Sequence, residues 1–188
     1  MLVVRDIFFS EYEIKKSKFI SYIAPFSEFE ALLEKLKNEH PKARHFVYAY
    51  RYLNNFNQIV ENSSDDGEPK GTSGKPTLAT LAGKDIVNSC IITVRYFGGI
   101  KLGTGGLVRA YSDSANLAIS KAELKEYKDE KSFEFNIEYS ELQRYEYVAK
   151  KLGIKVVDKV FNEKVTFKIV CEDEKKEEFL KEVLLHTS

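Results

Sequence analysis

The sequence is poor in the residues that build disulfide frameworks and metal sites. Its 188 residues include two cysteines and three histidines. Cys90 and Cys171 lie far apart within apolar runs, and no spacing of cysteine, histidine and acidic residues matches a zinc site. We therefore expect two small buried thiols, and we expect the protein to have no metal and no cofactor.

Long apolar segments are also missing. No run approaches the about 20 residues that a membrane helix needs. The apolar residues 2–4 are followed at once by Arg5 and Asp6, which does not match the pattern of a signal peptide. Both absences favour a cytoplasmic protein that makes no membrane contact.

An overall excess of charge is absent as well, because 29 basic residues balance 29 acidic ones. The balance is uneven along the chain. Up to Lys128 there are 18 Lys and Arg against 15 Asp and Glu, whereas the remainder has 11 against 14. Between Lys70 and Arg109, six basic residues accompany a single acid, Asp85. This local positive charge indicates an anionic partner more clearly than the whole-chain charge does.

Glycine is concentrated in the same stretch, since nine of the ten glycines lie between Asp65 and Arg109. Glycine lets the backbone turn tightly or approach a ligand closely. The glycines enclose the apolar run 90–97, which predicts a central strand buried on both faces. The order in this part of the chain is therefore a glycine loop, a strand, a second glycine loop and a helix.

The remaining patterns predict an α+β fold with two domains. Strands are predicted at 19–24, 44–52, 56–61, 90–97, 133–139, 154–161 and 165–171, and helices at 27–40, 77–82, 107–119, 140–152 and 173–184. Ser27 with Glu30, and Ser140 with Gln143, match capping boxes that would start two of the helices. The polar residues 125–131 are predicted to link a domain of residues 1–124 to a domain of residues 132–188.

The glycine loops match neither of the common nucleotide-binding motifs. A P-loop around Gly74-Lys75 would need a glycine at position 69 and a Ser or Thr at position 76, but both positions are proline. A dinucleotide fingerprint that starts at Gly103 would need a third glycine at position 108, which is valine. The helix start near Gly105 should still attract an anion. The alternative is a tight structural corner. The candidates for binding nucleic acid or another anion are Lys70, Gly71, Thr72, Lys75, Arg95, Gly98, Gly99, Lys101, Gly103, Thr104, Gly105, Gly106 and Arg109.

Three acidic residues, Asp65, Asp66 and Glu68, lie within the first glycine loop. They are candidates for holding a divalent cation or for acid–base chemistry. The alternative is a solvated turn, or a carboxylate that accepts hydrogen bonds from a neighbouring loop. No complete set of catalytic residues is present, so we assign none. Tyrosines and Phe97 near the basic residues would stack on bases if exposed, although most are expected to fill the core.

Two ordered motifs resemble those of the IMPACT family, and more closely its bacterial YigZ branch. The first runs from Asp65 to Pro76 as Asp-Asp-Gly-Glu-Pro-x-Gly-Thr-x-Gly-x-Pro. The second runs from Val94 to Tyr111 and contains Arg-Tyr-Phe-Gly-Gly and Leu-Gly-x-Gly-Gly-Leu-x-Arg-Ala-Tyr. The resemblance extends from about Ser17 to the last residue.

This resemblance implies a first domain similar to the second domain of ribosomal protein S5, a fold shared with domain IV of elongation factor G and with some small-molecule kinases. It implies a ferredoxin-like second domain similar to domain V of elongation factor G, whose last strand is not among the predicted elements. It also implies an association with translation, with RNA or the ribosome, or a translation-related protein, as partner. We therefore expect a binding protein; an enzyme acting on a small phosphorylated substrate or nucleotide at the same loop is the alternative.

Overall fold

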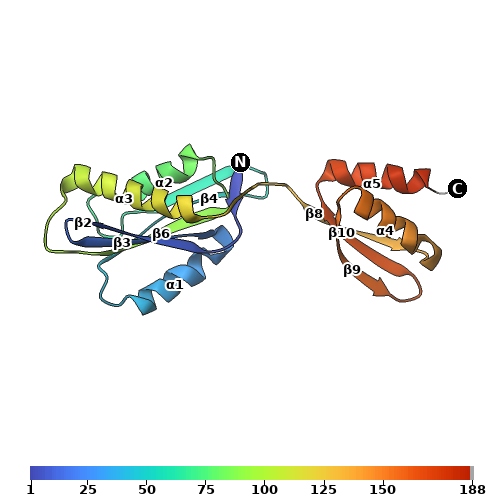
Figure 1. The fold of residues 1–188 in the computed structure, drawn as a ribbon, viewed down its shortest axis with the longest axis horizontal. Helices are drawn as coiled ribbons and strands as arrows, with labels where there is room; N and C mark the ends of the chain where they lie inside the picture. Colours follow the sequence, from blue (N-terminus) through green and yellow to red (C-terminus); the bar gives the residue numbers. More distant parts are fainter. Residues whose placement is uncertain (187–188) are drawn as a thin grey trace. The chain divides into compact units, whose positions relative to one another are not determined.

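The computed structural model describes residues 1–186 and divides the chain into two compact units, Met1–Tyr127 and Lys128–Ser188 (Figure 1). Each unit has its own sheet and its own apolar core. The architecture is α+β, as the sequence patterns indicate. No helix in the described part of the chain is long and apolar enough to cross a membrane.

A five-stranded antiparallel sheet forms the centre of the first unit. Its strand order is β2-β3-β6-β4-β5. The strands are β2 (Phe8–Ile14), β3 (Ser17–Pro25), β4 (His45–Leu53), β5 (Ile59–Ser64) and β6 (Ser89–Tyr96). In β6 every residue except Tyr96 is buried. The prediction of a central strand buried on both faces is therefore confirmed.

Helices cover both faces of this sheet (Figure 1). On one face α1 (Phe29–Glu39) packs Leu36 against a cluster that includes Ile92. On the other face α2 (Gly74–Gly83) and α3 (Gly103–Lys121) pack against a cluster that includes Ile91. Successive residues of β6 thus face opposite cores, because side chains alternate along a strand.

Two strands overlap the ends of the predicted linker, and the division between the two units falls within it. Strand β1 (Leu2–Val4) pairs with β7 (Leu124–Glu126), so the start of the predicted linker belongs to the first unit. Strand β8 already begins at Lys131. The segment between the two sheets is therefore shorter than the predicted linker of residues 125–131, and only residues 127–130 lie between the two strands.

The second unit has a three-stranded antiparallel sheet with the order β8-β10-β9. Its elements are β8 (Lys131–Ile137), α4 (Leu142–Lys151), β9 (Lys155–Phe161), β10 (Val165–Cys171) and α5 (Asp173–Leu185). Phe179 of α5 and Val148 of α4 share one core cluster with Phe167, so both helices lie on one face of the sheet. The β-α-β-β-α order matches a ferredoxin-like fold up to its second helix.

Both predicted capping boxes are wrong. A 3₁₀ turn at Phe26–Glu28 precedes α1, and no side chain caps that helix. Before α4 the reciprocal pair is Glu138 with Glu141, at the ends of a second 3₁₀ turn (Tyr139–Glu141). The serine positions fail because each 3₁₀ turn moves the start of the α-helix further along the chain.

Both cysteines are buried free thiols, as expected. Burial raises the pKa of the Cys90 thiol to about 12. A thiol with so high a pKa is almost wholly protonated at neutral pH and is a poor nucleophile. Cys90 therefore acts as a small core residue, next to α1 in the first unit.

Candidate functional site

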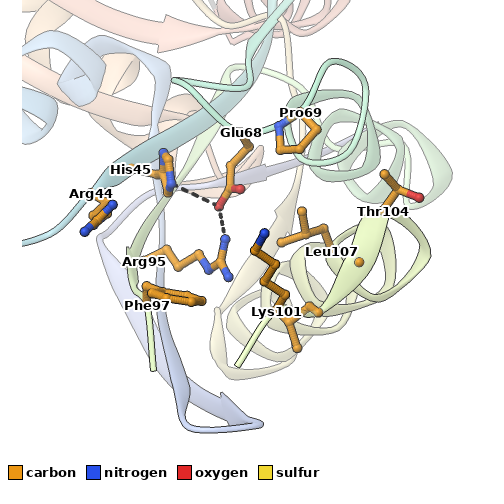
Figure 2. A pocket seen from close by; sticks show the side chains of 11 residues that line it. Arg44, His45, Glu68, Pro69, Arg95, Phe97, Lys101, Thr104 and Leu107 are labelled. Carbon is orange, nitrogen blue, oxygen red and sulfur yellow. Dashed lines mark hydrogen bonds and ion pairs between the residues drawn. The ribbon is translucent and has the colours of Figure 1, made fainter. Parts of the chain in front are cut away.

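A pocket of about 430 Å³ opens in the first unit where β4, β6, the acidic loop and the start of α3 meet (Figure 2). The acidic loop is the segment from Asp65 to Gly74. The pocket carries three cations and one carboxylate in addition to His45. The residues that line it are Arg44, His45, Glu68, Pro69, Arg95, Phe97, Lys101, Leu102, Gly103, Thr104 and Leu107.

Glu68 provides the buried carboxylate of this pocket, with only 3% of its side chain exposed. Its Oε1 accepts hydrogen bonds from Arg95 Nη1 at 2.5 Å and from the Tyr111 hydroxyl at 2.7 Å. His45 Nε2 lies 3.6 Å from the same oxygen. Burial, followed by the nearby Glu68 charge, raises the pKa of Tyr111, so this hydroxyl remains a hydrogen-bond donor. Residues from β4, β6 and α3 therefore meet at one atom.

Hydrogen-bonding capacity is left over in this buried group. The three contacts of Glu68 all go to Oε1, and its second oxygen points away from them into the pocket (Figure 2). Arg95 Nε is buried and has no hydrogen-bond partner among the described residues. Buried polar groups are normally satisfied, so an unpaired one calls for a specific explanation such as a ligand.

The start of α3 forms the opposite wall of the pocket. Leu102 holds the N-cap position, and no side chain of the described residues caps the helix there. Gly103 and Thr104 line the pocket and are exposed. Uncapped N–H groups and the helix dipole favour a negative charge at this point, and the exposed Lys101 adds a positive charge beside it. The start of α3 is therefore a candidate for an anion site.

The acidic loop is ordered around Asp65. Its Oδ1 accepts hydrogen bonds from the backbone of Ser73 and Gly74 at 3.2 and 2.8 Å and from the Ser73 hydroxyl at 2.8 Å. Its Oδ2 accepts one from the Gly71 amide at 2.9 Å, while the Thr72 amide donates to the Pro69 carbonyl. The amides of Gly71 and Thr72, two of the anion-binding candidates, are therefore already bound by the protein's own acceptors.

Replacement of Asp65 by asparagine is expected to destabilise the first unit by about 2 kcal/mol, because the new amide group would face N–H donors. Burial raises the pKa of Asp65, but hydrogen bonds from the loop outweigh it and hold the pKa below its usual value. The stabilisation from this carboxylate is therefore present above its usual pKa and lost as the pH falls below it. Urea unfolding across the acid range measures both effects. The exposed Asp6→Asn is the control, and equal loss in both variants would contradict the expectation.

The other two acids of the loop are also engaged within the protein. Asp66 Oδ2 accepts a hydrogen bond from the Phe46 amide at 2.7 Å, and the Asp66 carbonyl accepts one from His45 Nδ1 at 2.8 Å. Glu68 is held by Arg95 as described above. Within residues 1–186 no group of three His, Cys, Asp or Glu side chains is arranged to hold a metal ion.

The structure gathers only some of the candidates from the sequence around the pocket. Arg95, Lys101, Gly103 and Thr104 line it; Lys70, Lys75, Gly99, Gly105 and Arg109 are exposed elsewhere, and Gly98 and Gly106 are partly buried outside it. Among the aromatic candidates Phe97 lines the pocket and is 43% exposed, whereas Tyr111 is fully buried. Tyr48 and Tyr50 pack against Phe29 under α1, as the core alternative predicts.

Arg44 and His45 belong to the pocket but were not among the candidates. His45 begins β4 and Arg44 directly precedes it, and the register of the sheet pairs His45 with Arg95 of β6. Their position next to an arginine of a neighbouring strand is a consequence of strand pairing. The basic pair at 44–45 is visible in the sequence, but the sequence does not state which strand lies beside it.

Comparison with known proteins decides the family. The model of the Impact N-terminal domain matches residues 15–119, and a domain of unknown function, DUF1949, matches residues 135–183. The chain belongs to the IMPACT family. It is 36% identical to an IMPACT family member of Haemophilus influenzae over 85% of this chain and 79% of the relative. It is 35% identical to IMPACT family member YigZ of Escherichia coli K12 over 89% of this chain and 83% of the relative.

A solved structure described as a hypothetical protein also matches this IMPACT family chain, with a TM-score of 0.67 and 31% identity over 99% of this chain and 92% of the other. The two-domain translational regulator Yih1 is more distant. It gives a TM-score of 0.37 at 21% identity, over 64% of this chain and 47% of its own. At this level the similarity to Yih1 carries no argument about the function of the present protein.

Proposed function

We propose that this IMPACT family protein is a translation-associated protein that binds RNA through the pocket at the start of α3. The observation that carries the proposal is the coincidence in one pocket of an uncapped helix start and three cations, one of which is the buried Arg95 with its unpaired Nε. Phosphate groups suit helix N-termini, and arginine suits phosphate oxygens. RNA supplies such phosphates, and the expected association with translation makes the ribosome its most abundant source.

The alternative is an enzyme that acts on a small phosphorylated substrate in the same pocket. One observation favours it: the second oxygen of Glu68 faces the pocket. Glu68 is held by Arg95 and Tyr111, however, so one of its oxygens is already engaged within the protein. No nucleophile with an adjacent base has been identified at the pocket, so binding without chemistry is the better-supported function.

Binding of a labelled single-stranded RNA is expected to weaken steeply with salt, because bound phosphates release counterions. Lys101→Ala is expected to weaken binding and to reduce the slope of log affinity against log salt by about 0.7–1, the value of one lost phosphate contact. The exposed Lys84, which does not line the pocket, provides the control Lys84→Ala. Fluorescence anisotropy at several salt concentrations measures the slopes.

Two results would count against the proposal. One is the absence of RNA binding at low salt; the other is an equal change of slope in Lys101→Ala and Lys84→Ala, which would remove the pocket from the binding surface. Co-sedimentation of the wild type and of Lys101→Ala with ribosomes then tests the link to translation. A wild type that stays in the supernatant at low salt contradicts that part of the proposal.

A further inference from the structure

The pocket has a chemistry that internal phosphates of an RNA chain do not explain. Cations and the start of α3 suit a phosphate, but the free oxygen of Glu68 is an acceptor and repels one. That oxygen accepts no hydrogen bond from the described residues, so it is available to a donor group of a ligand in the pocket. The ligand must therefore carry a phosphate and, at a different point, hydroxyl or amino groups that donate.

The walls of the pocket show where the body of such a ligand would lie. Phe97, Pro69, Leu102 and Leu107 provide apolar surface. Phe97 is 43% exposed, and the guanidinium of Arg95 lies 5.8 Å from the centre of its ring. An exposed ring that is held by a cation is a suitable platform for a nucleic-acid base, because every base has a flat face that stacks.

The size of the pocket restricts how much of an RNA can enter. A volume of about 430 Å³ is at the small end of sites for small ligands, which range over about 300–1,000 Å³. If an internal nucleotide occupied the pocket, the RNA chain would have to pass out through the opening on both its 5′ and its 3′ side. A terminal nucleotide is joined to the chain on one side only, so the chain passes through the opening once. At a 3′ end this nucleotide also carries two free ribose hydroxyls.

We propose that the pocket takes the 3′-terminal nucleotide of an RNA chain. Its 2′ and 3′ hydroxyls donate to the free oxygen of Glu68, and its base lies against Phe97. The phosphate on its 5′ side is held by the uncapped amides of Gly103 and Thr104 and by Lys101. The inference rests on the proposed RNA binding. A free ribonucleoside 5′-phosphate has the same chemistry, so the test includes it.

The test compares four forms of one short labelled RNA by fluorescence anisotropy: with a free 3′ end, with a 2′,3′-dideoxy terminal nucleotide, with a 3′-phosphate, and closed into a circle. The free 3′ end is expected to bind at least about tenfold more tightly than the other three. The dideoxy end lacks both hydroxyl donors, the 3′-phosphate replaces one donor by a negatively charged acceptor in front of Glu68, and the circle has no end that can enter. Equal binding of all four forms would overturn the inference while leaving the proposed RNA binding intact. Absence of binding in every form would overturn both.

Variants assign the discrimination to the pocket. Glu68→Gln removes the charge but also disturbs the pair with Arg95, so a second variant is needed. Thr104→Phe fills the pocket from an exposed helix position, and Val108→Phe, one turn later and outside the pocket, is its control. Thr104→Phe is expected to bind the linear and circular RNAs equally, whereas Val108→Phe keeps the preference for the free 3′ end. A preference that persists in Thr104→Phe would overturn the inference.

Adenosine 5′-monophosphate distinguishes the two sources of the ligand. If the end of RNA is the ligand, the nucleotide displaces the RNA with a free 3′ end and displaces the circular RNA at least about tenfold less effectively. If the nucleotide binds while no RNA does, a free nucleotide is the occupant, and both the terminal-nucleotide inference and the RNA proposal are wrong.

Discussion

Replacement of Glu68 by alanine is expected to lower the free energy of unfolding of the first unit by about 3–5 kcal/mol. The change leaves the buried guanidinium of Arg95, whose side chain is 6% exposed, without its counter-charge. It also removes the acceptor of the buried Tyr111 hydroxyl. An unpaired buried charge costs far more than a surface ion pair contributes, which is why so large an effect is expected from one side chain.

The measurement is urea unfolding of the single variants Glu68→Ala and Arg95→Ala and of the double variant. Each single change leaves the other charged side chain buried and unpaired. The double variant is therefore expected to lose less stability than the sum of the losses in the two single variants. The exposed pair of Glu11 with Lys18 is a matched control, and Glu11→Ala is expected to cost at most about 1 kcal/mol. If Glu68→Ala costs no more than Glu11→Ala, the buried pair does not stabilise this unit.

The same result bears on the site, because Glu68 connects the elements that form it. Its partners come from three elements: His45 from β4, Arg95 from β6 and Tyr111 from α3. A carboxylate that joins these elements positions the start of α3 against the cations of the two strands. Glu68 therefore has two roles, with one oxygen holding the pocket together and the other available to a ligand.

The sequence predicted those parts of the fold that follow from periodicity. The apolar run 90–97 became β6, and the break before Pro41 ended α1 at Glu39. The sequence also named Arg95 and Lys101, which line the pocket, because glycine and positive charge are both concentrated there. Such signals are local, so they can be read without knowing how the strands pair.

What the sequence did not predict depends on contacts between distant residues. Helix α3 begins at Gly103, four residues before the predicted start, with a φ of +73° that glycine tolerates. Asp65 could have faced a metal, solvent or a neighbouring loop, and only the folded chain shows that it caps the start of α2. His45 joined the site through the register of β4 with β6, which pairs it with Arg95. These outcomes depend on tertiary structure, which propensities do not contain.

Replacement of Gly98 by alanine is expected to destabilise the first unit by about 3 kcal/mol, at the upper end of the cost of overpacking. A Cβ at this position would lie 2.0 Å from the backbone carbon and oxygen of Lys16, so the backbone of the turn after β2 would have to move. That turn has little freedom, because Lys15 and Lys16 already adopt positive φ values of 46° and 64°. The Gly98 amide also donates to the Ser17 hydroxyl at 3.3 Å.

Gly105→Ala is the matched control for this prediction, since nothing lies within 4 Å of the Cβ it would add and the residue is in the first turn of α3. Alanine favours a helix over glycine, so this variant is expected to be more stable by about 0.5–1 kcal/mol. Thermal and urea unfolding measure both variants. A Gly98→Ala protein as stable as the wild type would contradict the close approach of the turn. If Gly98→Ala lowers the free energy of unfolding and Gly105→Ala raises it, the two glycines of this motif have different structural roles. Gly98 permits close backbone packing, whereas Gly105 lies in open space at the start of α3.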